Sequence, residues 1–308
     1  MIKIVFFGTP EFAVASLDRL IADGLDIAAV VTAPDKPAGR GHKMLQSDVK
    51  RYALEHNLRI LQPERLKSEE FLSELHSINA DLFVVIAFRM LPEEVWAMPR
   101  LGTFNLHASL LPNYRGAAPI NRAVMAGETK TGVTTFFLKH EIDTGDIIEQ
   151  RETDIGPDEC VGDVHDRLMT IGADMVSHTV KEIEMGTVKT TPQPQGEFTP
   201  APKIFSEDCK IDWNRSNCEV HNHVRGLSPY PLAWSDMEDN SGRIIKLKIL
   251  KTKLTDIKAI PGNIVTNHGR FIVGCGEGSV EILEVLPAGK KKMDADAFLR
   301  GYSPVRFQ

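Results

Sequence analysis

The chain has 308 residues, of which 42% are hydrophobic and 25% are charged, and its formal net charge at pH 7 is −6. This composition is typical of an ordinary soluble globular protein, and no apolar run approaches the length of a membrane span. The length exceeds what one domain usually needs, so we expect two domains.

Cysteine usage and charge distribution add two expectations. The four cysteines include no C-x-x-C pair, and the chain opens on the apolar run IKIVFFG without the pattern of a signal peptide. We therefore expect reduced thiols in a cytoplasmic protein. No set of metal ligands is apparent in the sequence, so we expect no metal site, and we expect a monomer. Residues 206–308 carry 15 Lys and Arg against 13 Asp and Glu, whereas the remainder carries 21 against 29. This weak asymmetry favours an anionic partner for the C-terminal part.

The first elements predict a parallel sheet with helices on its faces. Residues 2–7 form a continuous apolar run, as expected for a strand that is buried on both faces. A helix follows, with Thr9 as its N-cap and Gly24 at its end, and residues 27–32 form a second strand. Strand, helix and strand within about thirty residues predict a right-handed βαβ unit. FGTPEF is not a dinucleotide or phosphate-binding sequence, so a nicotinamide enzyme is disfavoured.

The next segment, residues 33–44, predicts a basic surface loop. It contains Lys36, Arg40, His42 and Lys43 among two glycines and two prolines. Basic groups on a backbone of small residues suit a nucleic-acid phosphate chain, although a solvated loop has the same composition.

Helices over 47–56 and 68–78 and a buried strand, DLFVVIAF, continue the alternating pattern. Phe88, Arg89, Met90 and Leu91 follow this strand at its carboxyl end. Open α/β sheets bind their ligands at that edge.

The stretch from Leu101 to Gly145 contains the candidate catalytic residues. Asn105 and His107 are two residues apart in an apolar run that predicts a strand, so their side chains should share one face. Asp143 follows a second strand-like run on the turn HEIDTGD. A carboxamide, an imidazole and a carboxylate at adjacent strand ends can stabilise an oxyanion and move a proton. The same residue types are common in turns and as satisfied polar groups, so spacing alone leaves both interpretations open.

The remaining pattern completes a two-domain organisation. A strand over 147–152 and a helix over 160–185 precede a stretch rich in Pro, Thr and Gln, which is typical of a linker. Beyond it come one helix and short alternating strands with Gly and Asn turns, the pattern of a small antiparallel barrel. The prediction is an α/β domain with a Rossmann-like, doubly wound, mostly parallel sheet over 1–189, a linker over 190–206 and an OB-like β-barrel over 207–308.

The run HASLLPNYRGAAPI, with an Asn two residues before its His and a DTG sequence after it, resembles the formyltransferase family that uses 10-formyltetrahydrofolate. The resemblance extends in order through FFGTPEFAVASLDRL, PDKPAGRGHK, DTGD, IDWNRS and LPAGKKKM. It implies transfer of a formyl group from this folate to the α-amino group of methionyl initiator tRNA, with Asn105, His107 and Asp143 as catalytic residues.

The resemblance also implies which residues bind the two substrates. The backbone of Phe88, Arg89, Met90 and Leu91 would bind the pteridine ring, and Ser109, Leu110, Leu111 and Pro112 would lie at the folate. FRML departs from the Tyr-Gly-type pair of many tRNA-formylating members and resembles the glycinamide ribonucleotide formyltransferases. The tRNA would be bound by the basic loop, which enters the acceptor arm in such members, and by a C-terminal surface. The residues concerned are Lys36, Arg40, His42, Lys43, Lys290, Lys291 and Lys292.

Two alternatives stay open from the sequence. One is a small-molecule formyltransferase of the same family acting on a ribonucleotide or an amino sugar, against which the basic loop and the C-terminal domain argue. The other is an RNA-binding protein with an inactive α/β domain, against which the intact Asn105, His107 and Asp143 argue.

Overall fold

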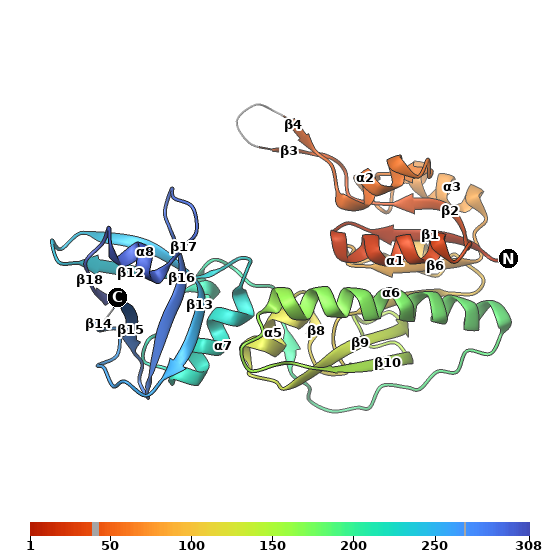
Figure 1. Cartoon of the computed structure of the whole chain (residues 1–308). Coiled ribbons are helices and arrows are strands. Elements are labelled where there is room, and N and C mark those ends of the chain that lie inside the picture. The colour runs from red at the N-terminus through yellow and green to blue at the C-terminus, as the bar shows by residue number, and fades with distance from the viewer. Residues whose placement is uncertain (39–42, 268) are drawn as a thin grey trace. The chain divides into compact units, whose positions relative to one another are not determined.

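The structure, a computed structural model, describes residues 1–38, 43–267 and 269–308 (Figure 1). The chain forms two compact units, each assembled from three segments. The first unit comprises Met1–Gly116, Gly132–Thr153 and His165–Pro200, and the second comprises Ala117–Thr131, Asp154–Val164 and Ala201–Gln308. The sequence did not indicate that two short internal segments would join the C-terminal unit. The expected division into a domain over 1–189, a linker over 190–206 and a domain over 207–308 stays a prediction.

The first unit is built on a seven-stranded sheet in the order β10-β9-β7-β6-β1-β2-β5. The five strands from β5 to β7 are parallel, and β9 runs antiparallel to β7. This arrangement confirms the predicted mostly parallel α/β sheet. The strands are β1 (Lys3–Gly8), β2 (Asp26–Val31), β5 (Ile60–Leu61), β6 (Leu82–Ile86), β7 (Thr103–His107), β9 (Lys130–Phe137) and β10 (Ile147–Asp154).

Helices cover the sheet and begin largely where the sequence predicts. They are α1 (Glu11–Ala22), α2 (Asp48–Glu55), α3 (Glu69–Ile78), the short α4 (Glu93–Trp96) and α6 (Val161–Met185), most of which belongs to this unit. The side chains of Ser47 and Ser68 cap α2 and α3. The Thr9 cap expected for α1 is wrong, because the extended Pro10 occupies the N-cap position and no side chain caps this helix.

The segment expected as a loop over 33–44 forms an antiparallel pair instead. Strands β3 (Lys36–Ala38) and β4 (Lys43–Leu45) are in register, with Lys36 opposite Leu45. At the base of this hairpin, Asp35 accepts hydrogen bonds from Lys50 Nζ at 2.6 Å and from Gln62 Nε2 at 2.9 Å. These contacts tie the hairpin to α2 and to the residue after β5, so its base is fixed on the first unit.

The second unit is a small antiparallel barrel, as predicted. Its main sheet has the order β14-β15-β16-β13-β12-β18, and Asn263, just before β14, bridges to Arg306 on β18, so the barrel nearly closes. The strands are β12 (Ala233–Asp239), β13 (Ile244–Thr255), β14 (Ile264–Asn267), β15 (Arg270–Gly274), β16 (Ser279–Pro287), β17 (Met293–Asp294) and β18 (Pro304–Phe307).

Three helices and a 3-10 turn complete the second unit. They are α5 (Pro119–Met125), α7 (Asn217–Leu227), α8 (Ala295–Leu299) and η1 (Glu207–Cys209). The short strands β8 (Arg115–Gly116), which belongs to the first unit, and β11 (Pro200–Ala201) pair with each other. Gly226 lets α7 approach α5 closely, since a Cβ there would lie 2.8 Å from the backbone nitrogen of Met125. Asn121 also donates a hydrogen bond to the carbonyl oxygen of Gly226 at 2.9 Å. These contacts explain why α5 belongs to the C-terminal unit.

No helix among the described residues is long and apolar enough to cross a membrane.

Buried His221 on α7 leads us to expect that the second unit loses stability in mild acid. Burial lowers the pKa of His221 from its ordinary 6.5, and the charge of Arg225 lowers it further. The ring contacts Thr252 Oγ1 at 3.0 Å and the Pro157 carbonyl oxygen at 3.1 Å. The folded chain therefore binds this proton less readily than the unfolded chain, so the stability is full above about pH 6.5 and falls as the pH drops below it.

Urea unfolding at several pH values between 5 and 8 measures this effect. His221→Gln should reduce the loss of unfolding free energy in acid, whereas His76→Gln, at an exposed position on α3, should leave it unchanged. Part of the slope should persist in the His221 variant because burial also lowers the pKa of His223. A slope that is identical in all three proteins would contradict the assignment to His221.

Candidate active site

Asn105 and His107 share one face of β7. Leu106 between them faces α6, where a Cβ on Gly172 would lie 2.7 Å from the Leu106 Cδ2 atom. Alternation along a strand therefore directs Asn105 and His107 to the opposite face of the sheet, as the sequence predicts. His107 is 6% exposed. The Oδ1 atom of Asn105 is buried and has no hydrogen-bond partner within the described residues.

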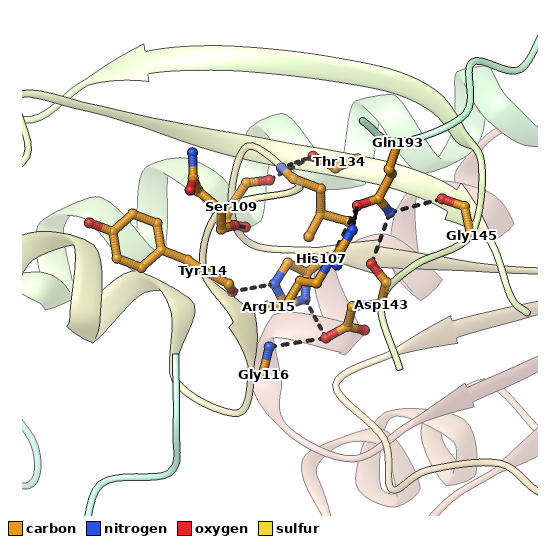
Figure 2. Close-up of polar contacts among 11 residues, drawn as sticks. His107, Ser109, Tyr114, Arg115, Gly116, Thr134, Asp143, Gly145 and Gln193 are labelled. Carbon is orange, nitrogen blue, oxygen red and sulfur yellow. Dashed lines mark hydrogen bonds and ion pairs between the residues drawn. The ribbon is translucent and has the colours of Figure 1, made fainter. Parts of the chain in front are cut away.

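The hydrogen bonding of His107 defines its tautomer. Its Nε2 atom lies 2.8 Å from the carbonyl oxygen of Tyr114, and a carbonyl oxygen only accepts hydrogen bonds, so Nε2 carries a proton (Figure 2). When the ring is neutral, Nδ1 is therefore the unprotonated nitrogen. This atom lies 3.9 Å from Oδ2 of Asp143.

Asp143 reaches His107 by a different route from the one expected. The sequence suggested that the three residues meet at adjacent strand ends. Because β9 is antiparallel, its last residue, Phe137, pairs with Phe104 near the start of β7, and His107 pairs with Thr134. The turn after β9 must therefore fold back along β7 to bring the Asp143 carboxylate to the imidazole.

Two features of this turn allow the return. Asp143 has a positive φ of 54°, a left-handed conformation that costs a non-glycine residue about 1–2 kcal/mol and that Asp tolerates better than most. Gly145 packs against the strand that the chain has just left, since a Cβ there would lie 1.6 Å from the carbonyl oxygen of Phe137. The carboxylate of Asp143 accepts a hydrogen bond from the Gly116 backbone N–H at 3.1 Å.

Sequence reasoning missed two residues that support this turn: Gln193, which contacts it, and Arg115, which contacts Gln193. The Gln193 amide nitrogen donates to the carbonyl oxygens of Asp143 and Gly145, each at 2.8 Å. The Gln193 oxygen accepts from Arg115 Nε at 3.2 Å and Nη2 at 2.5 Å (Figure 2). Gln193 belongs to the stretch that we predicted as a linker, where composition carries no signal for a contact across 50 residues of chain.

The segment expected at the folate, residues 109–112, is hydrogen-bonded to side chains of β9 and β10. Thr134 Oγ1 donates to the Ser109 carbonyl oxygen at 2.6 Å and accepts from the Leu111 N–H at 3.1 Å. Gln150 donates to the Leu111 carbonyl oxygen at 2.9 Å. Ser109 and Leu111 are buried, whereas Leu110 and Pro112 are partly exposed. The backbone of this segment is therefore fixed beside His107.

The segment from Phe88 to Leu91 lies at the carboxyl end of β6, as predicted. It follows Ala87, which, like Asp143 and Tyr114, is a non-glycine residue with positive φ, at 46°. Phe88 and Leu91 pack into the core of the first unit, and Met90 is 74% exposed. Arg89 donates hydrogen bonds to two carbonyl oxygens of residues 63–64, and partial burial lowers its pKa. The assignment of this segment to the pteridine ring stays a prediction.

The structure describes part of the predicted tRNA-binding set. Lys36 is exposed on β3, whereas Arg40 and His42 lie outside the described residues and Lys43 begins β4. On the second unit, three consecutive lysines are exposed between β16 and β17, and the last of them has its Nζ 3.1 Å from Glu284 Oε2. These are Lys290, Lys291 and Lys292. Within the part of the chain that the structure describes, no cluster of His, Cys, Asp or Glu forms a candidate metal site.

Comparison with known proteins identifies relatives along nearly the whole chain. A family model described as "Formyl transferase" matches residues 2–180, and one described as "Formyl transferase, C-terminal domain" matches residues 203–303. The chain is 52% identical over 308 residues to the methionyl-tRNA formyltransferase of Bacteroides fragilis, a match that covers 98% of this chain and 95% of the relative. It is 49% identical over 303 residues to the methionyl-tRNA formyltransferase of Flavobacterium johnsoniae, covering 97% and 96%.

Solved structures share the fold at lower identity. WlaRD, a sugar 3N-formyl transferase crystallised in the presence of dTDP and 5-N-formyl-THF, matches with a TM-score of 0.68 and 22% identity over 94% of this chain and 99% of that chain. HypX from Aquifex aeolicus in complex with tetrahydrofolic acid matches with a TM-score of 0.65 and 18% identity, covering 97% of this chain and 47% of that chain. At these identities the similarity establishes the fold alone.

The geometry of the turn leads us to expect that Gly145→Ala is strongly destabilising. The new Cβ would overlap the Phe137 carbonyl oxygen, so the turn must move away from β9, at a cost of about 1–3 kcal/mol or more. Thermal unfolding measures this cost. Gly301→Ala is the control, because the nearest atom to its Cβ is 3.9 Å away. Equal melting temperatures for wild type and Gly145→Ala would show that the turn does not pack as described.

Proposed function

The chain belongs to the formyl transferase family, and we propose that it transfers a formyl group from 10-formyltetrahydrofolate to the α-amino group of methionyl initiator tRNA. The observation that carries this proposal is the 52% identity to a methionyl-tRNA formyltransferase over 98% of the chain. That match runs through both compact units, rather than through the α/β fold alone. The product would supply the initiator for protein synthesis.

The reaction requires one new bond, one broken bond and one proton transfer. The amine nitrogen of the methionyl group bonds to the formyl carbon, which becomes tetrahedral with a negative oxygen. The bond from that carbon to N10 of the folate then breaks, and a proton lost by the amine is gained by N10. A free α-amino group has a pKa of roughly 8, so a neutral fraction is present at pH 7. Catalysis therefore needs oxyanion stabilisation and a proton path rather than a strong base.

Asn105 suits the oxyanion. A buried carbonyl oxygen without a donor is unfavourable unless a substrate supplies one. The unpartnered Oδ1 of Asn105 is therefore free to accept a hydrogen bond from the attacking amine, and its Nδ2 can donate to the developing oxyanion. One such preorganised donor is typically worth about 3–4 kcal/mol.

His107 and Asp143 suit the proton path. Because Nε2 is engaged by the Tyr114 carbonyl oxygen, Nδ1 is the nitrogen that exchanges a proton with substrate or water. The 3.9 Å from Nδ1 to the Asp143 carboxylate exceeds a hydrogen-bond distance, which leaves Nδ1 able to donate to the oxyanion while the carboxylate stabilises the imidazolium. We expect the folate to bind at residues 88–91 and 109–112, because these segments lie at the carboxyl ends of β6 and β7.

The test is a direct formylation assay with competing substrates. The purified protein is incubated with 10-formyltetrahydrofolate and methionyl initiator tRNA, and formylmethionine is measured by mass spectrometry after release from the tRNA. Parallel reactions supply glycinamide ribonucleotide or a dTDP-linked amino sugar in place of the tRNA. Formylation of either small molecule without formylation of the tRNA would overturn the proposal, as would tRNA binding with no formyl transfer at all.

Single alanine variants of the three proposed catalytic residues should lower the rate and preserve the fold. Asn105→Ala removes the oxyanion donor, and we expect a fall in single-turnover rate of about 100-fold to 1,000-fold. His107→Ala and Asp143→Ala should also reduce the rate by orders of magnitude, with tRNA affinity changed little. Circular dichroism and tRNA binding provide the controls. Rates close to wild type in all three variants would show that these residues are not catalytic.

The basic hairpin should contact tRNA phosphates. If so, each lost contact should flatten the dependence of log tRNA affinity on log salt by roughly 0.7–0.9. We expect Arg40→Ala to weaken tRNA use more than Lys36→Ala or Lys43→Ala, because a guanidinium forms two hydrogen bonds to a phosphate. The Michaelis constant for tRNA, measured at several salt concentrations, tests this, with the constant for folate as an internal reference. Lys189→Ala, at an exposed site on the first unit, is the matched control, and an equal effect there would exclude a specific contact.

A further inference from the structure

Gln193 connects the turn that carries Asp143 to the segment that contacts His107. Its amide nitrogen donates to two carbonyl oxygens of the turn, those of Asp143 and Gly145. Its amide oxygen accepts two hydrogen bonds from the guanidinium of Arg115. Every hydrogen-bonding direction of this amide is thereby used, as the dashed lines in Figure 2 show.

The orientation of the Gln193 amide is forced by its neighbours. If the amide were reversed, its oxygen would face two carbonyl oxygens and its NH₂ group would face the Arg115 guanidinium, so all four contacts would be repulsive. Arg115 is held in turn by the ring of Phe198, whose centroid lies 5.6 Å from the guanidinium carbon. The Gln193 amide therefore holds the turn in one position.

The segment that contains Arg115 also contacts both partners of the proposed proton path. The residue before it, Tyr114, accepts the Nε2 proton of His107, and the residue after it, Gly116, donates its N–H to the Asp143 carboxylate. Gln193 thus links the carbonyl oxygen of Asp143 to the segment that binds its carboxylate. Without that link, the left-handed backbone of Asp143 would lose the hydrogen bond to its own carbonyl oxygen, one of the contacts that oppose its relaxation.

We propose that Gln193 and Arg115 are positioning residues for formyl transfer, which act by holding Asp143 at the distance from His107 that the reaction needs. This proposal rests on the catalytic role proposed above for Asp143. The chain also tethers Gln193 from its amino side, where Thr191 and Ile147 exchange two backbone hydrogen bonds of 2.8 Å. These backbone hydrogen bonds do not involve the Gln193 side chain. Substitutions of Gln193 therefore change its amide contacts while the backbone of residues 191–193 stays anchored.

Two substitutions of Gln193 separate the contacts of its amide. Gln193→Leu has a similar volume and loses every hydrogen bond. Gln193→Glu keeps an acceptor for Arg115 but places carboxylate oxygens against the two carbonyl oxygens. Because a small misplacement of a catalytic group can cost about 100-fold, we expect both variants to lower the single-turnover formylation rate by about 10-fold to 100-fold. The Michaelis constants for tRNA and folate should change by less than about threefold, since neither substrate is proposed to touch Gln193. Gln195→Leu, at an exposed position two residues later, is the matched control and should match wild type.

A double variant shows whether Gln193 acts through Asp143. Asn also tolerates a left-handed backbone, so Asp143→Asn removes the carboxylate while keeping the turn. We expect Gln193→Leu to cause no further loss of rate in the Asp143→Asn protein. Losses that multiply would overturn the positioning role, and so would a wild-type rate in Gln193→Glu. If Asp143→Asn alone retained the full rate, the catalytic role of Asp143 would fail, and the positioning role would fail with it.

Hydrogen exchange supplies a readout that does not depend on activity. The Gly116 N–H donates to the Asp143 carboxylate, so peptides covering residues 114–118 and 139–147 should exchange faster in Gln193→Leu than in Gln195→Leu. Faster exchange in a protein that formylates no tRNA would confirm that the contacts hold the turn and would place the failure in the proposed function. Unchanged exchange in both peptides would overturn the proposal, whatever the activity.

Discussion

His107 donates its Nε2 proton to the carbonyl oxygen of Tyr114 at 2.8 Å, and this hydrogen bond determines what else the imidazole can do. It leaves Nδ1, the nitrogen that faces Asp143, as the atom available for the proposed proton exchange. A carboxylate on the Nδ1 side of the ring can stabilise the imidazolium without competing for the hydrogen bond of Nε2. The Asp143 turn, with its contacts to Gly116 and Gln193, meets the requirement for a carboxylate on that side of the ring.

Strand direction makes the requirement difficult to meet. A parallel strand beside β7 would deliver its following loop to the carboxyl end of the sheet, where His107 lies. Strand β9 is antiparallel and delivers its loop to the other end, so the chain has to reverse within a few residues. Gly145 makes the reversal tight, and the positive φ of Asp143 turns its side chain toward the ring. The hydrogen bonds of Gln193 offset part of the cost of that conformation.

The parts of this arrangement that were predictable are those with a local pattern. Continuous apolar runs predicted β1 and β6, and a spacing of two residues predicted that Asn105 and His107 share a face. The resemblance of DTG and its surroundings pointed to Asp143. The pairing of β3 with β4 was missed because Gly and Pro favour loops, whereas backbone pairing between residues 36–38 and 43–45 overrides that preference. The contact between Arg115 and Gln193 spans 78 residues and leaves no periodic trace, so single-sequence reasoning had no means of finding it.

The side-chain amides of Gln193 and Asn105 differ in how many of their hydrogen-bonding groups are engaged by the protein. This difference indicates which amide positions other residues and which is suited to bind substrate. The amide of Gln193 has both donors and its acceptor engaged by protein groups, so it has nothing left to offer a substrate. The amide of Asn105 has a buried oxygen for which the described residues provide no donor. A buried acceptor without a donor costs about 1–3 kcal/mol. A bound ligand that donates a hydrogen bond to it removes this cost. Asn105 is therefore the amide suited to bind the reacting groups, and Gln193 is the amide suited to keep the carboxylate beside them.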